Sequence, residues 1–164
     1  MNKVIVIGCP GAGKSTFSRQ LNEMTGIPLY YLDMMYWNSD RTTVTKELFR
    51  ERLLKVLGLE NWIIDGNYGS TMEMRMAECD TVIFLDFTAE TCLKGVRERK
   101  GKPRPDMPWV ETEDDEEFFE FIKKFEIESK PKILELFKKY HEKEIVILKS
   151  REEADRYISS LKGD

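Results

Sequence analysis

The chain has 164 residues, 41% of them apolar, and a formal net charge of −4 at pH 7, which suits one globular domain spanning residues 1–164. No apolar run approaches the ~20 residues of a membrane span, and the amino terminus lacks the layout of a signal peptide. The negative charge argues against a nucleic-acid partner, and three cysteines without metal-ligand spacing indicate a reduced, cytoplasmic protein.

The first fifteen residues predict a phosphate-binding loop between a strand and a helix. Residues 3–7 (KVIVI) form a β-branched apolar run typical of a buried parallel strand, and Phe17, Leu21 and Met24 recur at helical spacing. Residues 8–15 between them (GCPGAGKS) match G-x-x-x-x-G-K-[ST]. A plain glycine turn is the alternative. We predict that the residues binding ATP here are Gly8, Pro10, Gly11, Ala12, Gly13, Lys14, Ser15 and Thr16.

Two side chains of this loop carry further chemistry. We expect Lys14 to reach the β- and γ-phosphates and to act in catalysis, and the Ser15 hydroxyl to ligate Mg²⁺.

Four more apolar runs predict strands that alternate with amphipathic helices. The expected strands are 28–32, 62–65, 81–86 and 144–148. The expected helices are 45–57 with Thr45 as cap, 70–77 with Ser70 and Glu73 as a capping box, 88–100 with Thr88 as cap, two around 118–125 and 133–137, and one after Ser150. On the helix over 45–57 we expect Leu48, Leu53, Leu54 and Leu57 to face the core. Strands alternating with helices predict an α/β fold in which helices cover both faces of a parallel sheet.

Several side chains near the strand ends have two interpretations each. Tyr30, Tyr31, Tyr36 and Trp37 either wall an acceptor pocket or belong to the core. Arg75 either grips an acceptor anion or forms a surface salt bridge with Glu73 or Glu78. The segment 149–151 (KSR) after the last strand either touches the nucleotide base or serves only as a helix cap.

A cationic segment precedes a loop rich in proline and charge. Residues 97–104 hold five cations and one acid, and Gly101, Pro103 and Pro105 suit a lid with defined hinges. We predict a mobile lid over 101–113 that closes on bound nucleotide, with Arg97 and Arg104 as its catalytic candidates and Arg97 also binding ATP. The alternative is a solvated helix end, where the helix dipole favours cations.

Three segments resemble the P-loop kinases of the adenylate kinase and shikimate kinase type: residues 8–15, residues 63–66 (IIDG), and Arg97-Glu98-Arg99 ahead of Arg104. The strings YLD at 31–33, IDGNYG at 64–69 and RPD at 104–106 are similar to the topology modulation, or FlaR-related, group of these proteins. The resemblance covers almost the whole chain and implies a P-loop fold with strand order 2-3-1-4-5.

The resemblance also implies roles for two carboxylates. Asp65 would lie next to Ser15 and hold a Mg²⁺-bound water, and Asp86 is the competing candidate. Asp33 would face the acceptor and orient or deprotonate its hydroxyl group. Adenylate kinases carry phenylalanine-proline-arginine where this chain has Asn67-Tyr68-Gly69, so their nucleotide-acceptor arginine has no counterpart at that point.

These patterns predict an ATP-dependent kinase that transfers the γ-phosphoryl group to a small-molecule acceptor. The acceptor is a nucleoside, a nucleotide or another hydroxylated metabolite, and the sequence leaves its identity and the oligomeric state open. Two alternatives are a nucleotide-binding regulator that influences DNA topology and an NTPase switch that works through a partner protein.

Overall fold

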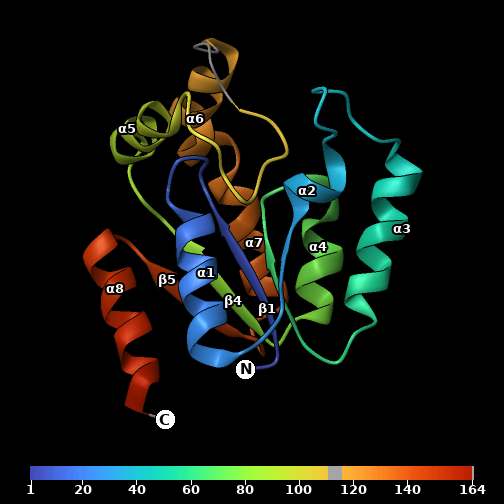
Figure 1. Cartoon of the computed structure of the whole chain (residues 1–164). Coiled ribbons are helices and arrows are strands. Elements are labelled where there is room, and N and C mark those ends of the chain that lie inside the picture. Colours follow the sequence, from blue (N-terminus) through green and yellow to red (C-terminus); the bar gives the residue numbers. More distant parts are fainter. Residues whose placement is uncertain (111–115, 164) are drawn as a thin grey trace.

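A five-stranded parallel sheet forms the centre of the computed structural model, which describes residues 1–110 and 116–163 (Figure 1). Its strands are β1 (Lys3–Gly8), β2 (Leu29–Tyr31), β3 (Trp62–Asp65), β4 (Thr81–Leu85) and β5 (Glu144–Leu148). They lie in the order β2-β3-β1-β4-β5, and every neighbouring pair is parallel. The predicted fold class and strand order are therefore confirmed.

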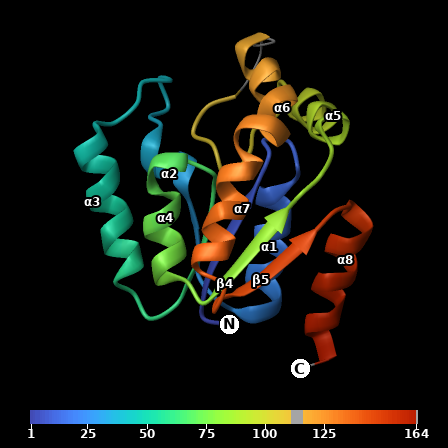
Figure 2. The same cartoon turned by 180° about the vertical axis from the view of Figure 1, so that it is seen from behind.

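Helices cover both faces of this sheet, as the crossovers between parallel strands require. They are α1 (Lys14–Thr25), α2 (Leu32–Tyr36), α3 (Lys46–Leu57), α4 (Gly69–Glu78), α5 (Ala89–Arg99), α6 (Glu116–Glu128), α7 (Lys130–Lys139) and α8 (Arg151–Ser160), followed by the 3₁₀ turn Leu161–Gly163. Helices α1 and α8 lie on the face toward the viewer in Figure 1, and α4 and α7 lie on the opposite face (Figure 2). Helices α5 and α6 lie beyond the carboxyl ends of the strands.

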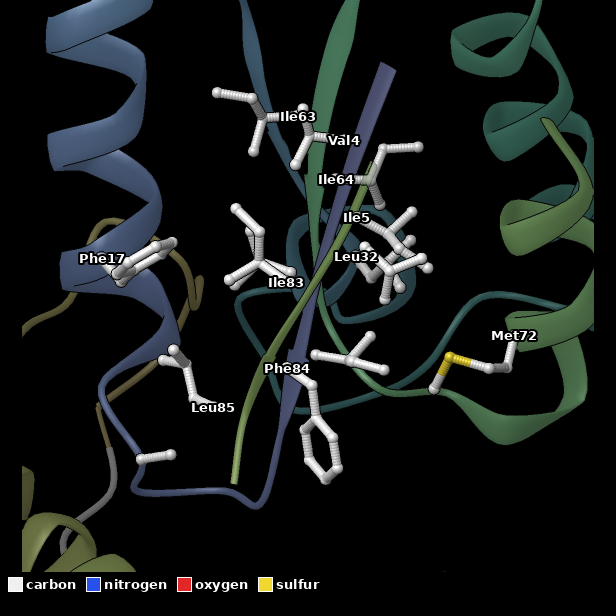
Figure 3. Packing of buried hydrophobic residues seen from close by; sticks show 14 of the residues in the cluster. Val4, Ile5, Phe17, Leu32, Ile63, Ile64, Met72, Ile83, Phe84 and Leu85 are labelled. Atoms are coloured by element: carbon white, nitrogen blue, oxygen red, sulfur yellow. The ribbon is translucent and has the colours of Figure 1, made fainter. Parts of the chain in front are cut away.

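The core fills the space between the sheet and these two helical layers. Phe17 of α1 and Met72 of α4 approach the sheet from opposite sides (Figure 3). Because both faces of the central strands are covered, Val4 to Ile7 are all fully buried, which explains why β1 is a continuous apolar run.

Three helix caps were predicted correctly from the sequence. The hydroxyl groups of Thr45, Thr88 and Ser150 accept hydrogen bonds from the backbone N–H groups of Leu48, Thr91 and Glu153. Each of these bonds satisfies an N–H that has no partner within its helix.

The predicted capping box at Ser70 and Glu73 is wrong. Helix α4 begins at Gly69, so Ser70 lies inside its first turn. The preceding residue, Tyr68, takes a left-handed φ of 29° and makes no side-chain cap. Tyr68 also contacts Asp33 through its hydroxyl group and Arg75 through its carbonyl oxygen, and the helix begins two residues earlier than the capping pattern indicates.

Two further expectations differ from the structure. Residues after β2 form the short helix α2 instead of a loop, which places Asp33 in a helical turn. On α3, Leu48 and Leu54 are more than one third exposed, whereas Phe49 and Val56 are buried. Leu53 and Leu57 are buried as predicted, so two of the four expected leucine positions face the core.

The carboxyl end of α5 leads into the cationic loop. Arg104 and Met107 form an isolated antiparallel bridge there, and residues 111–113 of the predicted lid lie outside the described residues. Within the described chain, no helix is both long and apolar enough to cross a membrane. Cys9, Cys79 and Cys92 are buried free thiols.

Candidate active site

A cleft of about 1160 Å³ opens at the carboxyl ends of the strands. One side is formed by the loop between β1 and α1, and the other by the α2 region and the end of β3. The loop after α5 and the start of α6 complete the wall. Ligands of open parallel sheets bind at this edge because the loops there converge from separate strands.

The loop over 8–15 has the backbone that a phosphate cradle requires. Gly11 and Gly13 both take a φ of 88°, which side chains disfavour. A Cβ atom at Gly11 would lie 2.0 Å from the Cys92 carbonyl oxygen, and a Cβ atom at Gly95 would lie 2.2 Å from the Gly11 carbonyl oxygen. The backbone of α5 therefore packs directly against the loop.

Asn67 fixes the beginning of this loop from the neighbouring strand. Its Oδ1 accepts a hydrogen bond from the Gly8 N–H at 3.0 Å, and its Nδ2 donates to the Gly8 carbonyl oxygen. The side-chain amide thus continues the pairing of β3 with β1 by one more rung. The sequence showed Asn67 as a departure from adenylate kinases but gave no signal of this contact.

Lys14 and Ser15 begin helix α1 at the floor of the cleft. The Lys14 Nζ lies 3.4 Å from the Cys9 carbonyl oxygen, so its side chain folds back over the loop. The Ser15 hydroxyl accepts a hydrogen bond from the Arg19 guanidinium at 2.8 Å, and the same group reaches the Thr16 hydroxyl at 3.4 Å. Arg19 also lines the cleft and was not singled out from the sequence.

Asp65 ends β3 opposite Val6 of β1 and lines the same cleft as Ser15. Burial raises the pKa of this carboxyl group to about 7, and the nearby Lys14 cation opposes that shift. The carboxylate therefore depends on local positive charge to remain ionised at neutral pH.

The Ser15 hydroxyl and the Asp65 carboxylate are the kind of oxygen ligands that Mg²⁺ prefers. The described residues contain no cluster of three or more acidic, histidine or cysteine side chains that could hold a metal ion. Mg²⁺ in nucleotide sites is held by one or two protein oxygens, phosphates and water, so two side chains fit this ion.

Asp86, the competing candidate, lies elsewhere. Its carboxylate forms a 2.9 Å ion pair with Lys130 at the start of α7, and it is absent from the described residues that line the cleft. This ion pair gives Asp86 a structural partner and favours Asp65 as the acid of the site.

Asp33 faces the cleft from α2 and accepts a hydrogen bond from the Tyr68 hydroxyl. Burial raises the pKa of Asp33, whereas the Tyr68 hydroxyl and the Lys14 cation lower it. Burial also raises the pKa of Tyr68, so its hydroxyl remains a donor. The left-handed backbone of Tyr68 holds this side chain against Asp33.

The cations at the end of α5 and in the loop after it divide into two groups. Arg99, Lys102 and Arg104 line the cleft, and the Arg104 Nε lies 3.7 Å from a carboxylate oxygen of Asp106. Arg97 is exposed and does not line the cleft. Its guanidinium lies 5.6 Å from the centre of the Phe119 ring of α6. The structure thus brings Arg104 to the site and leaves Arg97 outside it.

Neither interpretation of Arg75 holds. Its side chain is completely buried, and its guanidinium donates to the Thr71 hydroxyl and to the carbonyl oxygens of Gly66, Asn67 and Tyr68. Arg75 therefore holds the turn between β3 and α4 in place.

The aromatic residues predicted near the acceptor separate by position. Tyr31 and Trp37 line the cleft, whereas Tyr30 and Tyr36 pack against the core. At the opposite end of the cleft, Arg151 donates to the Ala12 carbonyl oxygen at 3.3 Å, and its guanidinium lies 5.5 Å from the centre of the Phe87 ring.

Several solved structures share this fold. Shikimate kinase from Acinetobacter baumannii, in complex with shikimate, matches with a TM-score of 0.65 at 17% identity over 98% of this chain and 90% of that one. The fold is that of the P-loop kinases. Shikimate kinase from Bacteroides thetaiotaomicron matches with a TM-score of 0.57 at 18% identity over 98% and 95% of the two chains. Deoxyadenosine kinase from M. mycoides with bound dATP matches with a TM-score of 0.55 at 18% identity over 96% and 98%.

No protein-family model matches the sequence, and no curated protein matches it significantly. At these identities the likeness to P-loop kinases extends to the fold, and the activity has to be argued from the site itself.

Proposed function

We propose that this protein is an ATP-dependent kinase that transfers the γ-phosphoryl group to a hydroxyl group of a small molecule. One observation carries the proposal: Asp33 lies in the same cleft as Lys14, Ser15 and Asp65. A phosphate loop alone also suits a switch or a regulator. The partly buried Asp33 carboxylate lines the same cleft from α2 and can accept a hydrogen bond from an acceptor hydroxyl group.

The roles of the residues follow from the charge that moves during phosphoryl transfer. The acceptor oxygen bonds to the γ-phosphorus as the bond to the leaving oxygen of ADP breaks. Asp33 accepts the proton of the acceptor hydroxyl, and a raised pKa makes it a better base than an exposed aspartate. Lys14 neutralises charge on the phosphate oxygens.

Ser15 and Asp65 would hold Mg²⁺, which neutralises charge on the phosphates when it is bound. Arg104 lies on the loop opposite Lys14 and supplies a second cation to the transferring group. The Lys14 cation beside Asp65 lowers the pKa of that carboxyl group and so favours its ionised form.

The topology modulation group is the subgroup to which the sequence strings point, and we retain that membership as part of the proposal. A kinase and a regulator of DNA topology differ in the acceptor half of the cleft. In a kinase, the Asp33 carboxylate, which Tyr68 holds by a hydrogen bond, would accept the proton of the acceptor hydroxyl group. A regulator that binds nucleic acid would need cations at this position, because they attract the phosphate backbone.

An acceptor screen tests the proposal. Purified protein with Mg²⁺ and ATP is given candidate hydroxyl compounds, including shikimate and deoxyadenosine, which the structural neighbours are named for. ADP release is measured above an acceptor-free control, and the phosphorylated product is identified by mass. Asp33→Asn should lose most of the acceptor-dependent release and keep ATP affinity. If no compound raises ADP release above the control, the kinase assignment is wrong and the alternative of an NTPase switch is favoured.

A further inference from the structure

The half of the cleft opposite the phosphate loop is walled by aromatic rings. Tyr31, Trp37, Tyr68 and Trp109 all line it. Trp37 and Trp109 come from two separate segments of the chain and meet at the cleft. Their indole rings are in edge-to-face contact, with centres 5.6 Å apart and planes at 75° to each other. Aromatic faces of this kind bind flat rings by stacking.

Two polar groups in this half have hydrogen-bonding capacity that the described residues leave unused. The Trp109 Nε1 donor and the Asp106 Oδ1 acceptor are both shielded from solvent and have no hydrogen-bond partner there. Asp106 Oδ1 faces the Arg104 Nε at 3.7 Å, which is an ion-pair distance beyond hydrogen-bond range. Asp106 itself is 9% exposed. A buried polar group without a hydrogen-bond partner is costly, so a ligand that pairs with either atom gains affinity. A ligand with both a hydrogen-bond acceptor and a donor would use the two groups.

The cations nearest these rings already interact within the protein. The Arg41 guanidinium lies 4.8 Å from the centre of the Trp109 ring and donates to the Val110 carbonyl oxygen at 3.0 Å. The Arg104 side chain faces the Asp106 carboxylate, and Arg75 is buried under the turn after β3. Asp33 and Asp106 add negative charge to the same half of the cleft. This balance suits an uncharged ligand better than a phosphorylated or carboxylated one.

Arg41 also takes a left-handed backbone conformation, with a φ of 71°. A non-glycine residue in this region is strained and persists where its surroundings hold it. This backbone conformation places the Arg41 guanidinium over the Trp109 ring. Arg41 thereby connects the turn formed by residues 38–42 with the segment that ends in Val110. Trp37 and Trp109 are thereby held close together across the mouth of the acceptor half.

We propose that the phosphoryl acceptor is an uncharged nucleoside, whose heteroaromatic base stacks against the edge-to-face pair of Trp37 and Trp109 and pairs with Trp109 Nε1 and Asp106 Oδ1. This inference rests on the proposed kinase function and names the substrate class of that site. The hydroxylated sugar then lies toward Asp33, which is on the phosphate-loop side of the rings. Base and sugar together account for the aromatic walls, the unused donor and acceptor, and the carboxylate.

Binding is measured first, separately from turnover. Of the three tryptophans, Trp62 is completely buried in β3, so a fluorescence change on ligand addition reports Trp37 and Trp109. The full chain is titrated, in the presence of Mg²⁺ and a non-hydrolysable ATP analogue, with adenosine, guanosine, cytidine and thymidine. The same titration is run with their 5′-monophosphates and with shikimate. We expect at least one nucleoside to bind about tenfold or more tightly than its monophosphate and than shikimate.

Variants separate the two contacts, with affinities taken from calorimetry because the fluorophore changes. Trp109→Phe keeps a ring and removes the N–H, so nucleoside affinity should fall about fivefold, the loss of one hydrogen bond. Trp109→Leu removes the ring as well and should cost about 100-fold in affinity. Tyr140→Phe is the matched control, because it removes a hydrogen-bond donor to Glu73 far from the cleft. ATP-analogue affinity should stay unchanged in all three and confirms that each variant folds.

The outcomes distinguish this inference from the kinase proposal. Nucleoside binding that weakens in both Trp109 variants supports the inference even if no phosphoryl transfer follows. Failure of every nucleoside to bind, tighter binding of a monophosphate or of shikimate, or unchanged affinity in both Trp109 variants would overturn it. Phosphorylation of shikimate without nucleoside binding would support the proposed kinase function and contradict the inference that the acceptor is a nucleoside.

Discussion

At the scale of single residues, Asp65 couples stability to pH. Its pKa is about 7 in the folded protein and near 4 when exposed, so the folded state binds more protons between these values. The contribution of Asp65 to the free energy of unfolding therefore falls as pH rises from about 4 to 7. Asp65→Asn should become more stable than the natural protein across this window, by up to a few kcal/mol, since each unit of pKa shift is about 1.4 kcal/mol.

Urea unfolding of both proteins at pH 4.5 and pH 7.5 measures this difference. Asp40→Asn is the control: hydrogen bonds from Thr42 hold the pKa of this exposed carboxyl group below its usual range, so the difference should not grow between these two pH values. A constant difference between Asp65→Asn and the natural protein would contradict the raised pKa.

Arg104 is the second residue with a sharp expectation. Its guanidinium contacts Asp106 before transfer, and its charge is most useful when negative charge spreads over the moving phosphoryl group. Arg104→Ala should lower kcat by about 100-fold or more with a modest effect on ATP affinity. Arg97→Ala is the matched control, because that side chain lies outside the cleft. Equal kcat losses in both variants would remove the distinction between the two arginines.

Prediction from sequence worked best for residues in one contiguous motif. Residues 8–15 carry their function within a single turn, so Lys14 and Ser15 could be named at once. Asn67 and Arg75 could not, because their partners are backbone groups whose positions depend on the assembled sheet and turn. Trp109 and Asp106 follow the predicted lid hinge, and only the fold brings them opposite Trp37.

At the scale of elements, the contact of α5 with the phosphate loop allows a direct test. Gly95→Ala would place a Cβ atom 2.2 Å from the Gly11 carbonyl oxygen, so the helix or the loop must shift. We expect ATP affinity to fall at least tenfold and stability to fall by about 1–3 kcal/mol, as for overpacking. In Gly58→Ala the nearest atom is 3.6 Å away, and calorimetry should show unchanged ATP affinity. Equal affinities in the two variants would mean that the loop tolerates displacement.

The segment from Gly101 to Val110 is the element expected to respond to nucleotide. Its prolines limit the conformations available, and Lys102 and Arg104 face the phosphate loop across the cleft. Amide hydrogen exchange across it should slow when Mg²⁺ and a non-hydrolysable ATP analogue are added, whereas exchange in α3 should not change. Equal amide hydrogen-exchange rates with and without nucleotide would show that the segment does not respond to nucleotide binding.

The capping hydroxyl groups were predictable for a related reason. Thr45, Thr88 and Ser150 act on the N–H three residues ahead, so a short pattern contains the whole interaction. The start of α4 was mistaken because Tyr68 takes an unusual φ, and this conformation depends on Asp33 and Arg75. Long-range contacts decided that boundary.

At the scale of the whole molecule, bound nucleotide should raise thermal stability. A ligand at 100 times its Kd stabilises the native state by about 2.7 kcal/mol. For a chain of 164 residues this corresponds to an increase in Tm of about 5–10 °C. Thermal unfolding followed by circular dichroism with and without Mg²⁺ and ATP measures the shift, and Lys14→Ala should abolish most of it. A similar shift in Lys14→Ala would show that ATP binds outside the predicted loop.

The strands themselves were accessible from sequence because each is a separate apolar run, and their order followed from the resemblance of residues 8–15 and 63–66 to P-loop kinases. The relation of the lid to the α2 region was not accessible, because it depends on contacts such as Arg41 with Trp109 between segments far apart in the chain. The acceptor half of the cleft is built from these contacts, which is why its chemistry became readable only in the folded molecule.

The buried thiols have a practical consequence for measurements of motion. Cys9, Cys79 and Cys92 are at most 3% exposed, so maleimide dyes should react with them slowly. A cysteine introduced at Lys102 and another at Glu51 would be the reactive positions of the chain, and no native thiol has to be removed. Donor and acceptor dyes can therefore report the opening of the cleft in single molecules whose phosphate loop keeps its natural sequence.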